Sequence, residues 1–129
     1  MEELTHLGKQ SSDPVEQLDR IPWEGSPLVV RLNCSEFTSH CPVTRQPDFG
    51  KLIIEYVPDQ FIAETKSVKL YLWQFRQQAQ FNERLADGIA LDIYTQLEPK
   101  ALRVTGAFNP RGGISVTATA TYGDESLLP

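Results

Sequence analysis

The chain has 129 residues, of which 40% are hydrophobic and 22% charged, and its formal net charge is −5. This length and balance predict one globular domain and exclude wholesale disorder. The negative charge disfavours nucleic-acid binding through a broad basic surface. No apolar run approaches the ~20 residues of a membrane span. The acidic sequence MEELTHLGKQ lacks a signal-peptide pattern, so we expect a cytoplasmic protein without a membrane or nucleic-acid partner.

The first part of the chain differs from the rest in composition. Residues 1–27 carry six acidic and two basic side chains, three prolines and little hydrophobic periodicity. We therefore expect an N-terminal extended arm over residues 1–27 and a single domain over residues 28–129.

Two strands are predicted next, at residues 28–33 and 51–57. LVVRLN alternates apolar and polar residues after Val29, and KLIIEYV is a β-branched and aromatic run ended by Pro58. We expect an antiparallel pair joined by a long loop.

Two amphipathic helices and two further strands follow. The apolar residues of the first helix are Val68, Tyr71, Leu72 and Phe75, and those of the second, ended by Pro99, are Phe81, Leu85, Ile89, Ile93 and Leu97. Residues 101–108 and 114–122 have strand patterns, with NPRGG between them as a loop. The order ββααββ predicts an α+β domain with two helices on one face of a four-stranded antiparallel sheet. Such a small open sheet has edges to cover, so we expect self-assembly.

The loop CPVTRQPDFG (41–50) places Cys41 seven residues before Asp48, with Pro42 and Pro47 restricting the backbone. A cysteine can be a small buried apolar residue, or a nucleophile if its thiolate is favoured. Asp48 could then exchange a proton with the thiol or with a substrate atom. A zinc site is disfavoured, because the four possible ligands lack a familiar spacing; they are His6, Cys34, His40 and Cys41.

Three further stretches carry charged residues that have a structural and a functional interpretation. Lys66 and Lys69 share one helix face, as a solvated surface or as a phosphate-binding pair. Arg111 precedes two glycines, in a plain turn or in a phosphate-binding loop. Glu83 at the start of the second helix either complements the helix dipole or accepts two hydrogen bonds from a flat heterocycle.

Together these stretches resemble a known family. ETKSVKLY (64–71), EFTSHCPVTRQPDFG (36–50) and FNPRGGIS (108–115) are similar, in order and spacing, to the motifs of the NADPH-dependent 7-cyano-7-deazaguanine reductases of queuosine biosynthesis, a transfer-RNA modification pathway. The resemblance covers about residues 31–122. It implies the tunnelling fold, in which ββααββ units assemble into homo-oligomeric rings with active sites between subunits.

The resemblance also implies a reaction and its residues. Cys41 would attack the nitrile carbon of the deazapurine to form a thioimide, and Asp48 would handle the proton on the nitrile nitrogen. NADPH, as co-substrate, would reduce the thioimide and then the imine to the aminomethyl product. The implied substrate contacts are Ala63, Glu64, Thr65, Asn82 and Glu83, and the implied cofactor contacts are Lys66, Lys69, Arg111 and Gly112.

Three positions depart from the family pattern. Thr65 stands where the family has Ser or Leu, Arg45 where it often has Gly, and Asn82 where it usually has a catalytic His. Asparagine cannot titrate near neutral pH. Either another group supplies the proton, or the chain is a variant that stalls turnover.

Two competing hypotheses remain at this level. One is a relative that passes the same thioimide to an ammonia-like nucleophile, as amidinotransferase-like enzymes do on transfer RNA. The other is a binding protein that captures the nitrile covalently without turnover. The implied cofactor residues count against the first, and Asn82 favours the second. The sequence leaves open whether Cys34 can pair with Cys41.

Overall fold

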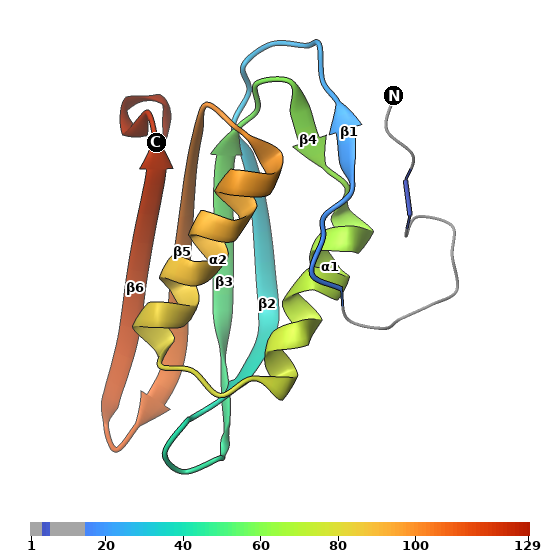
Figure 1. Cartoon of the computed structure of the whole chain (residues 1–129). Coiled ribbons are helices and arrows are strands. Elements are labelled where there is room, and N and C mark those ends of the chain that lie inside the picture. Colours follow the sequence, from blue (N-terminus) through green and yellow to red (C-terminus); the bar gives the residue numbers. More distant parts are fainter. Residues whose placement is uncertain (1–3, 6–14) are drawn as a thin grey trace.

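The computed structural model describes residues 4–5 and 15–129 of the chain. The elements are β1 (Arg20–Pro22), β2 (Val30–His40), β3 (Pro47–Val57), β4 (Phe61–Ala63), α1 (Thr65–Trp73), the 3₁₀ helix η1 (Gln74–Gln77), α2 (Asn82–Leu97), β5 (Ala101–Arg111), β6 (Ile114–Gly123) and a final 3₁₀ turn (Glu125–Leu127) (Figure 1). None of the helices in the described ranges has the length and apolar character needed to span a membrane.

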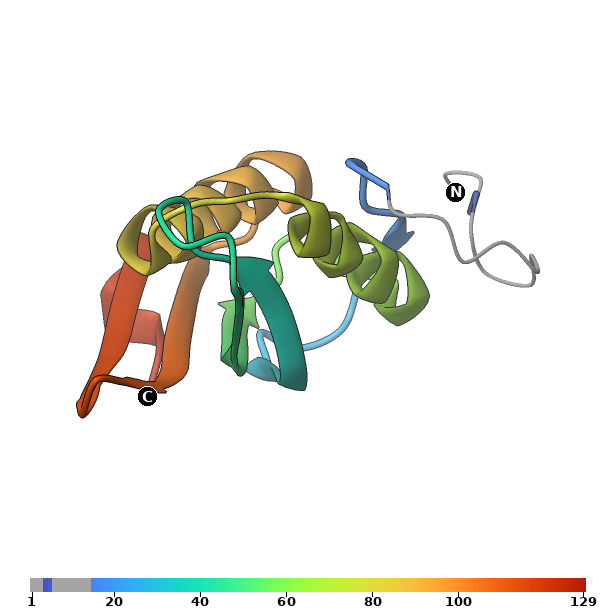
Figure 2. The same ribbon diagram turned by 90° about the horizontal axis from the view of Figure 1, so that it is seen from below.

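The main sheet is antiparallel with strand order β2-β3-β5-β6. Both helices cover the same face of this sheet (Figure 2), so the predicted α+β class is confirmed. The element order departs from the expected ββααββ, because β1 and β4 form a separate two-stranded sheet. Three-residue strands are too short to show a hydrophobic period, which is why the sequence did not predict them.

The core lies between the helices and the inner face of the sheet. The expected apolar residues of the first helix are buried, and so are those of the second helix from Leu85 onward. Phe81 is an exception, because it precedes α2 as its N-cap and is 57% exposed. Tyr71 joins the two helices through a 2.7 Å hydrogen bond from its hydroxyl to Asp92 Oδ2. Burial and this carboxylate strongly raise the pKa of Tyr71.

The described part of the predicted arm packs on the domain. Leu18 is buried, and its backbone N–H donates to Gln96 Oε1 at 2.8 Å on α2. The backbone N–H of Asp19 donates to Ser67 Oγ at 2.9 Å on α1. These contacts belong to residues that precede the expected boundary at residue 28; the division into arm and domain stays a prediction.

Two expected loop boundaries are wrong. Pro47 and Asp48 belong to β3, where Pro47 pairs with His40 as the first residue of the strand. A proline is tolerated at a strand start, since its missing N–H interrupts no ladder there. The NPRGG segment is mostly strand as well, with Gly112 and Gly113 alone forming the turn at φ 57° and 81°. Glycine adopts these left-handed values without strain, as a tight hairpin requires.

A β-bulge in β2 fixes which residues face the helices near the end of the strand. Cys34 pairs with Leu52 and Phe37 pairs with Gly50, so β2 holds one residue more than β3 over this interval. After the extra residue, the inward positions change to Phe37 and Ser39, both buried. Bulges re-aim side chains in this way and occur often beside active sites.

Gly50 allows β3 to approach β5 closely next to the bulge. A Cβ at this position would lie 2.6 Å from the Ala107 carbonyl oxygen and 2.9 Å from Phe108 Cα, both backbone atoms. We expect Gly50→Ala to lower the free energy of unfolding by about 1–3 kcal/mol, because the strands must separate. Urea denaturation measures this change.

Gly88→Ala is the matched control. Gly88 lies within α2, and a Cβ there would meet nothing within 4 Å. Alanine should therefore raise the free energy of unfolding by up to about 1 kcal/mol through helix propensity. Equal effects of the two substitutions would contradict the close approach at Gly50.

Candidate active site

Cys41 follows the last residue of β2 and begins a closed loop over residues 41–46. The Cys41 N–H donates to the Gln46 carbonyl at 3.0 Å, and the Arg45 N–H donates back to the Cys41 carbonyl at 3.0 Å. Arg45 has φ 62°, in the left-handed region that favours glycine. The loop therefore keeps a glycine-type conformation at the position where the resembled family often has glycine.

The loop itself activates the Cys41 thiol. The pKa of Cys41 lies below its ordinary value mainly because the Thr44 backbone N–H, then the Thr44 hydroxyl and the Val43 N–H, hydrogen-bond to the sulfur. The charge of Arg111 adds a smaller effect in the same direction. Hydrogen bonds to a thiolate favour the charged, nucleophilic form. Cys34 is the opposite case, because burial raises its pKa.

Asp48 lies on β3, buried, in the position directly opposite Ser39 of β2. Its Oδ1 accepts from Arg111 Nε at 2.7 Å. The same guanidinium donates to the Pro47 carbonyl at 3.2 Å and to Thr44 Oγ1 at 3.4 Å. Arg111, at the end of β5, therefore links the β5–β6 turn to Thr44 within the Cys41 loop and to Pro47 at the start of β3.

The start of α2 lies beside the end of β2. The His40 N–H donates to the Gln78 carbonyl at 3.1 Å, and the Gln80 N–H donates to the His40 carbonyl at 3.2 Å. This short ladder leads into Asn82 and Glu83, the first two residues of α2. Glu83 is exposed, whereas Asn82 Oδ1 is buried without a hydrogen-bond partner. Cys41, Asp48, Asn82, Glu83, Arg111 and Gly112 thus gather at one end of the sheet (Figure 1).

The other predicted site residues surround the start of α1. They are Ala63, Glu64, Thr65, Lys66 and Lys69. Glu64 is the N-cap of α1, and its buried carboxylate accepts from the N–H groups of Ser67 at 2.9 Å and Lys66 at 2.6 Å. The Glu64 carboxylate therefore has a structural role in this chain, because it accepts hydrogen bonds from backbone N–H groups that have no partner within the helix.

One chain does not bring these two groups together. The start of α1 is separated from the Gln78–His40 contact by the length of α1 and η1. Nine α-helical and four 3₁₀ residues span about 20 Å. The two groups thus lie near opposite ends of the helical layer (Figure 1).

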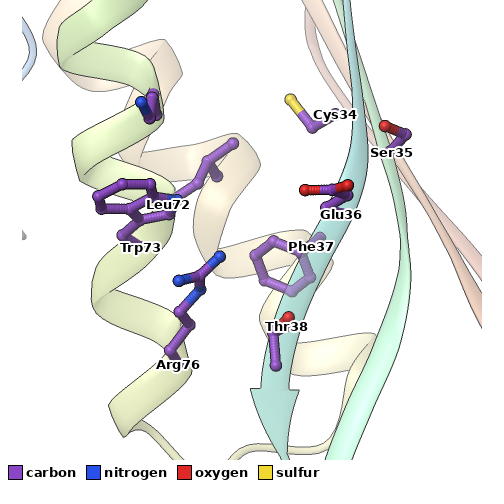
Figure 3. A pocket seen from close by; sticks show the side chains of 9 residues that line it. Cys34, Ser35, Glu36, Phe37, Thr38, Leu72, Trp73 and Arg76 are labelled. Carbon is purple, nitrogen blue, oxygen red and sulfur yellow. The ribbon is translucent and has the colours of Figure 1, made fainter.

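A groove runs between α1 and the open edge of β2. It encloses about 320 Å³ and is lined on the helix side by Lys69, Trp73 and Arg76. Lys69 Nζ lies 4.7 Å from the centroid of the Trp73 ring, and Arg76 Cζ lies 5.0 Å from it. Figure 3 shows Trp73 and Arg76 across the groove from Glu36, Phe37 and Thr38 of β2. Two cations beside an indole form a surface suited to a phosphate-bearing aromatic ligand.

Sequence reasoning missed several of these residues. Thr44 reaches the Cys41 sulfur only because the loop closes, and Ser39 faces inward only because of the bulge in β2. Trp73 and Arg76 line a groove only because α1 and η1 lie beside β2. Ser39 and Thr44 lie within the motif at residues 36–50, but neither is a charged residue that would have marked it as functional. The spacing of Lys69, Trp73 and Arg76 on one helical stretch was the one available signal.

Neither a zinc site nor a disulfide is supported. Across residues 4–5 and 15–129, no three His, Cys, Asp or Glu side chains form a metal-binding group, and His6 lies outside these ranges. Cys34 and Cys41 are both free. They are about 20 Å apart along an extended backbone, whereas a disulfide needs Cα atoms within about 7 Å.

Comparisons with known proteins agree on one family. The family model described as QueF-like protein matches residues 47–126, more than half of the chain. A protein from Parabacteroides distasonis named NADPH-dependent 7-cyano-7-deazaguanine reductase is 46% identical over 100 residues, which cover 78% of this chain and 64% of the relative. One of the same name from Zymomonas mobilis subsp. mobilis is 43% identical over 120 residues, or 88% of this chain and 82% of the relative.

The Bacteroides fragilis relative of that name is 50% identical over 94 residues, which cover 73% of this chain and 62% of the relative. The chain thus spans less than two thirds of the Parabacteroides and Bacteroides relatives. A crystal structure of an archaeosine synthase QueF-Like in the apo form matches with a TM-score of 0.71 at 24% identity, over 77% of this chain and 97% of that chain. The structural match establishes a shared fold.

The activation of Cys41 has a testable consequence. We expect Thr44→Val to raise the pKa of the Cys41 thiol, because the hydroxyl hydrogen bond is lost while the backbone N–H groups remain. Alkylation of Cys41 by iodoacetamide should become severalfold slower at neutral pH. The midpoint of the curve of alkylation rate against pH should move to higher pH. The measurement is the alkylation rate against pH in a Cys34→Ser background.

Thr117→Val serves as the control, because Thr117 is exposed on β6, at the far edge of the sheet. It should leave the alkylation profile unchanged. A Thr44→Val profile identical to that of the control would show that the loop does not activate Cys41.

Proposed function

The chain belongs to the QueF-like protein family, and from this premise we propose that it reduces the nitrile of 7-cyano-7-deazaguanine to 7-aminomethyl-7-deazaguanine with NADPH, in queuosine biosynthesis. The names of the relatives support this activity. The observation that carries it is Cys41, whose loop favours the thiolate at the end of the sheet where Asp48 is buried. A nitrile is a suitable substrate, because its carbon accepts a sulfur nucleophile.

The first step is addition of the Cys41 thiol across the carbon–nitrogen triple bond. The thiol proton passes to the Asp48 carboxylate, and the sulfur attacks the nitrile carbon. One π pair of the triple bond moves to nitrogen and takes the proton back from Asp48, which leaves a covalent thioimide. The hydrogen-bonded loop supports this step, since it holds the sulfur in a fixed position for attack.

NADPH, when bound, supplies the hydride for each of the two reductions that convert the nitrile to the amine. The groups that would hold its phosphates are Lys66 and Lys69 of one copy of the chain, with Arg111 and the backbone at Gly112 of another, because the two pairs lie near opposite ends of the helical layer within one chain. The donor set fits: Lys69 lies in the groove beside Trp73 and Arg76, and the Arg111 side chain is 39% exposed while it contacts Asp48. Cations of this kind favour phosphate.

Substrate recognition would use Asn82 and Glu83 near Cys41. Glu83 is exposed in the first turn of α2, where its carboxylate can accept two hydrogen bonds from the guanine-like edge. The unpartnered Oδ1 of Asn82 is an acceptor for a further substrate N–H. Asp48 carries a carboxylate near Cys41 and takes the proton-transfer role that the Asn82 amide cannot fill.

The remaining substrate positions, Ala63, Glu64 and Thr65, would come from a second copy of the chain. Their separation from Cys41 within one chain supports active sites between subunits. Both β2 and β6 are edge strands of the sheet, with unpaired backbone groups for a neighbouring copy. A head-to-tail contact between these two edges generates a ring, as in the tunnelling fold.

A non-turnover protein that keeps the nitrile on Cys41 is the second candidate. Asn82 favours it, because an amide cannot deliver a proton in the reductive steps. An amidinotransferase-like reaction has less support, since it makes no use of the cations in the groove beside α1.

Consumption of NADPH on addition of 7-cyano-7-deazaguanine tests the reductase. We expect steady oxidation of about two NADPH per nitrile, because each of the two reductions takes one hydride. Cys41→Ala should abolish it, whereas Gly88→Ala, within α2 and with nothing within 4 Å of the added Cβ, should leave it unchanged. Consumption that survives Cys41→Ala, or none in the unchanged protein, would contradict the proposal.

A further inference from the structure

Ser39 carries a hydroxyl that the folded chain buries and leaves unpaired. The residue is 0% exposed, and Ser39 Oγ and Asn82 Oδ1 are the two buried side-chain polar atoms of the described residues that lack a hydrogen-bond partner. A buried unpaired hydroxyl destabilises a protein, and such groups are rare in native structures without a functional reason. Both atoms lie at the Cys41 end of the molecule: Ser39 precedes Cys41 by two residues, and Asn82 begins α2.

The bulge in β2 points Ser39 at the same face as Asp48. The two residues occupy paired positions of β2 and β3, and both are buried on the side of the sheet that the helices cover. Side chains at paired antiparallel positions have Cβ atoms about 4.5–5.5 Å apart. A rotation of one side chain therefore brings the Ser39 hydroxyl within hydrogen-bond distance of the Asp48 carboxylate.

Arg111 Nε lies 2.7 Å from Oδ1 of Asp48. When a substrate covers Cys41 and excludes water, the second carboxylate oxygen needs a protein donor. Ser39 occupies the position of β2 that pairs with Asp48, and its hydroxyl has no hydrogen-bond partner in the ligand-free chain.

We infer that Ser39 is a positioning residue for Asp48: in the reacting state its hydroxyl donates to the Asp48 carboxylate and holds it toward the nitrogen of the group bound to Cys41. This inference rests on the proposed function. Ser39 is too deeply buried to touch the substrate, so it acts through Asp48. The unpaired hydroxyl then lowers the stability of the free protein, and it is kept because turnover requires it.

This role predicts opposite effects of Ser39→Ala on stability and on turnover. The melting temperature should rise by about 2–5 °C, because an unpaired buried hydroxyl is removed. Ser67→Ala is the matched control for stability. Ser67 is also 0% exposed, but its hydroxyl donates to the Glu64 carbonyl at 2.7 Å and accepts from the Asp19 N–H at 2.9 Å. The same substitution there should lower the melting temperature.

Turnover of Ser39→Ala should fall about tenfold or more in kcat, with KM little changed, because Asp48 is oriented less well during proton transfer. The titratable and charged groups at this end are His40, Cys41, Arg45, Asp48, Glu83, Arg84 and Arg111. Ser39→Ala leaves all of them in place.

The experiment measures the melting temperature and the kcat and KM of NADPH oxidation for the unchanged protein and Ser39→Ala, with melting of Ser67→Ala alongside. Higher stability with lower kcat and little change in KM supports the inference. An active unchanged protein with an unaltered kcat in Ser39→Ala overturns the role of Ser39 alone. A lower melting temperature for Ser39→Ala also overturns it, since the hydroxyl would then be paired. An inactive unchanged protein overturns the proposed function and this inference with it.

Discussion

The contact between Arg111 and Asp48 organises the end of the sheet on which the rest of the site depends. It joins the last residue of β5 to β3, and the same guanidinium reaches Thr44 and the Pro47 carbonyl. A buried carboxylate needs such a partner, because an unpaired charge away from water is strongly unfavourable. The ion pair thus stabilises Asp48 beside Cys41 and restrains the loop whose N–H groups favour the thiolate. The contacts of Arg111 therefore both stabilise this end of the sheet and hold the Cys41 loop in place.

A second constraint is that one chain keeps the two groups of predicted site residues apart. The N-cap of α1 and the Cys41 loop are held at opposite ends of the helical layer by the rigid length of α1 and η1. The groove beside α1 lies along β2, an open edge of the sheet. Joining of sheet edges between copies would therefore satisfy the backbone of both edge strands and complete the site at once. The same geometry would let a small chain hold both of the proposed substrates.

Much of this architecture follows from the sequence, and the exceptions have physical causes. The apolar spacing from Leu85 to Leu97 predicted α2, and Pro99 its end, because helix periodicity and proline chemistry are local. The placement of Asp48 on a strand, the bulge before Phe37 and the orientation of Ser39 depend on the pairing of β2 with β3, which is not local. Motif similarity predicted site roles for Cys41, Asp48 and Arg111. It did not indicate that Arg111 contacts Asp48, or that Glu64 caps α1, because these contacts arise only in the folded chain.

Intact-protein mass spectrometry shows whether Cys41 is the nucleophile for a nitrile. The protein is incubated with 7-cyano-7-deazaguanine without NADPH, and the modified residue is located by peptide mapping. We expect a mass increase equal to one whole substrate molecule, because thiol addition to a nitrile expels nothing, carried by Cys41 and absent from Cys41→Ala. An unmodified chain, or an adduct on Cys34, would contradict the account.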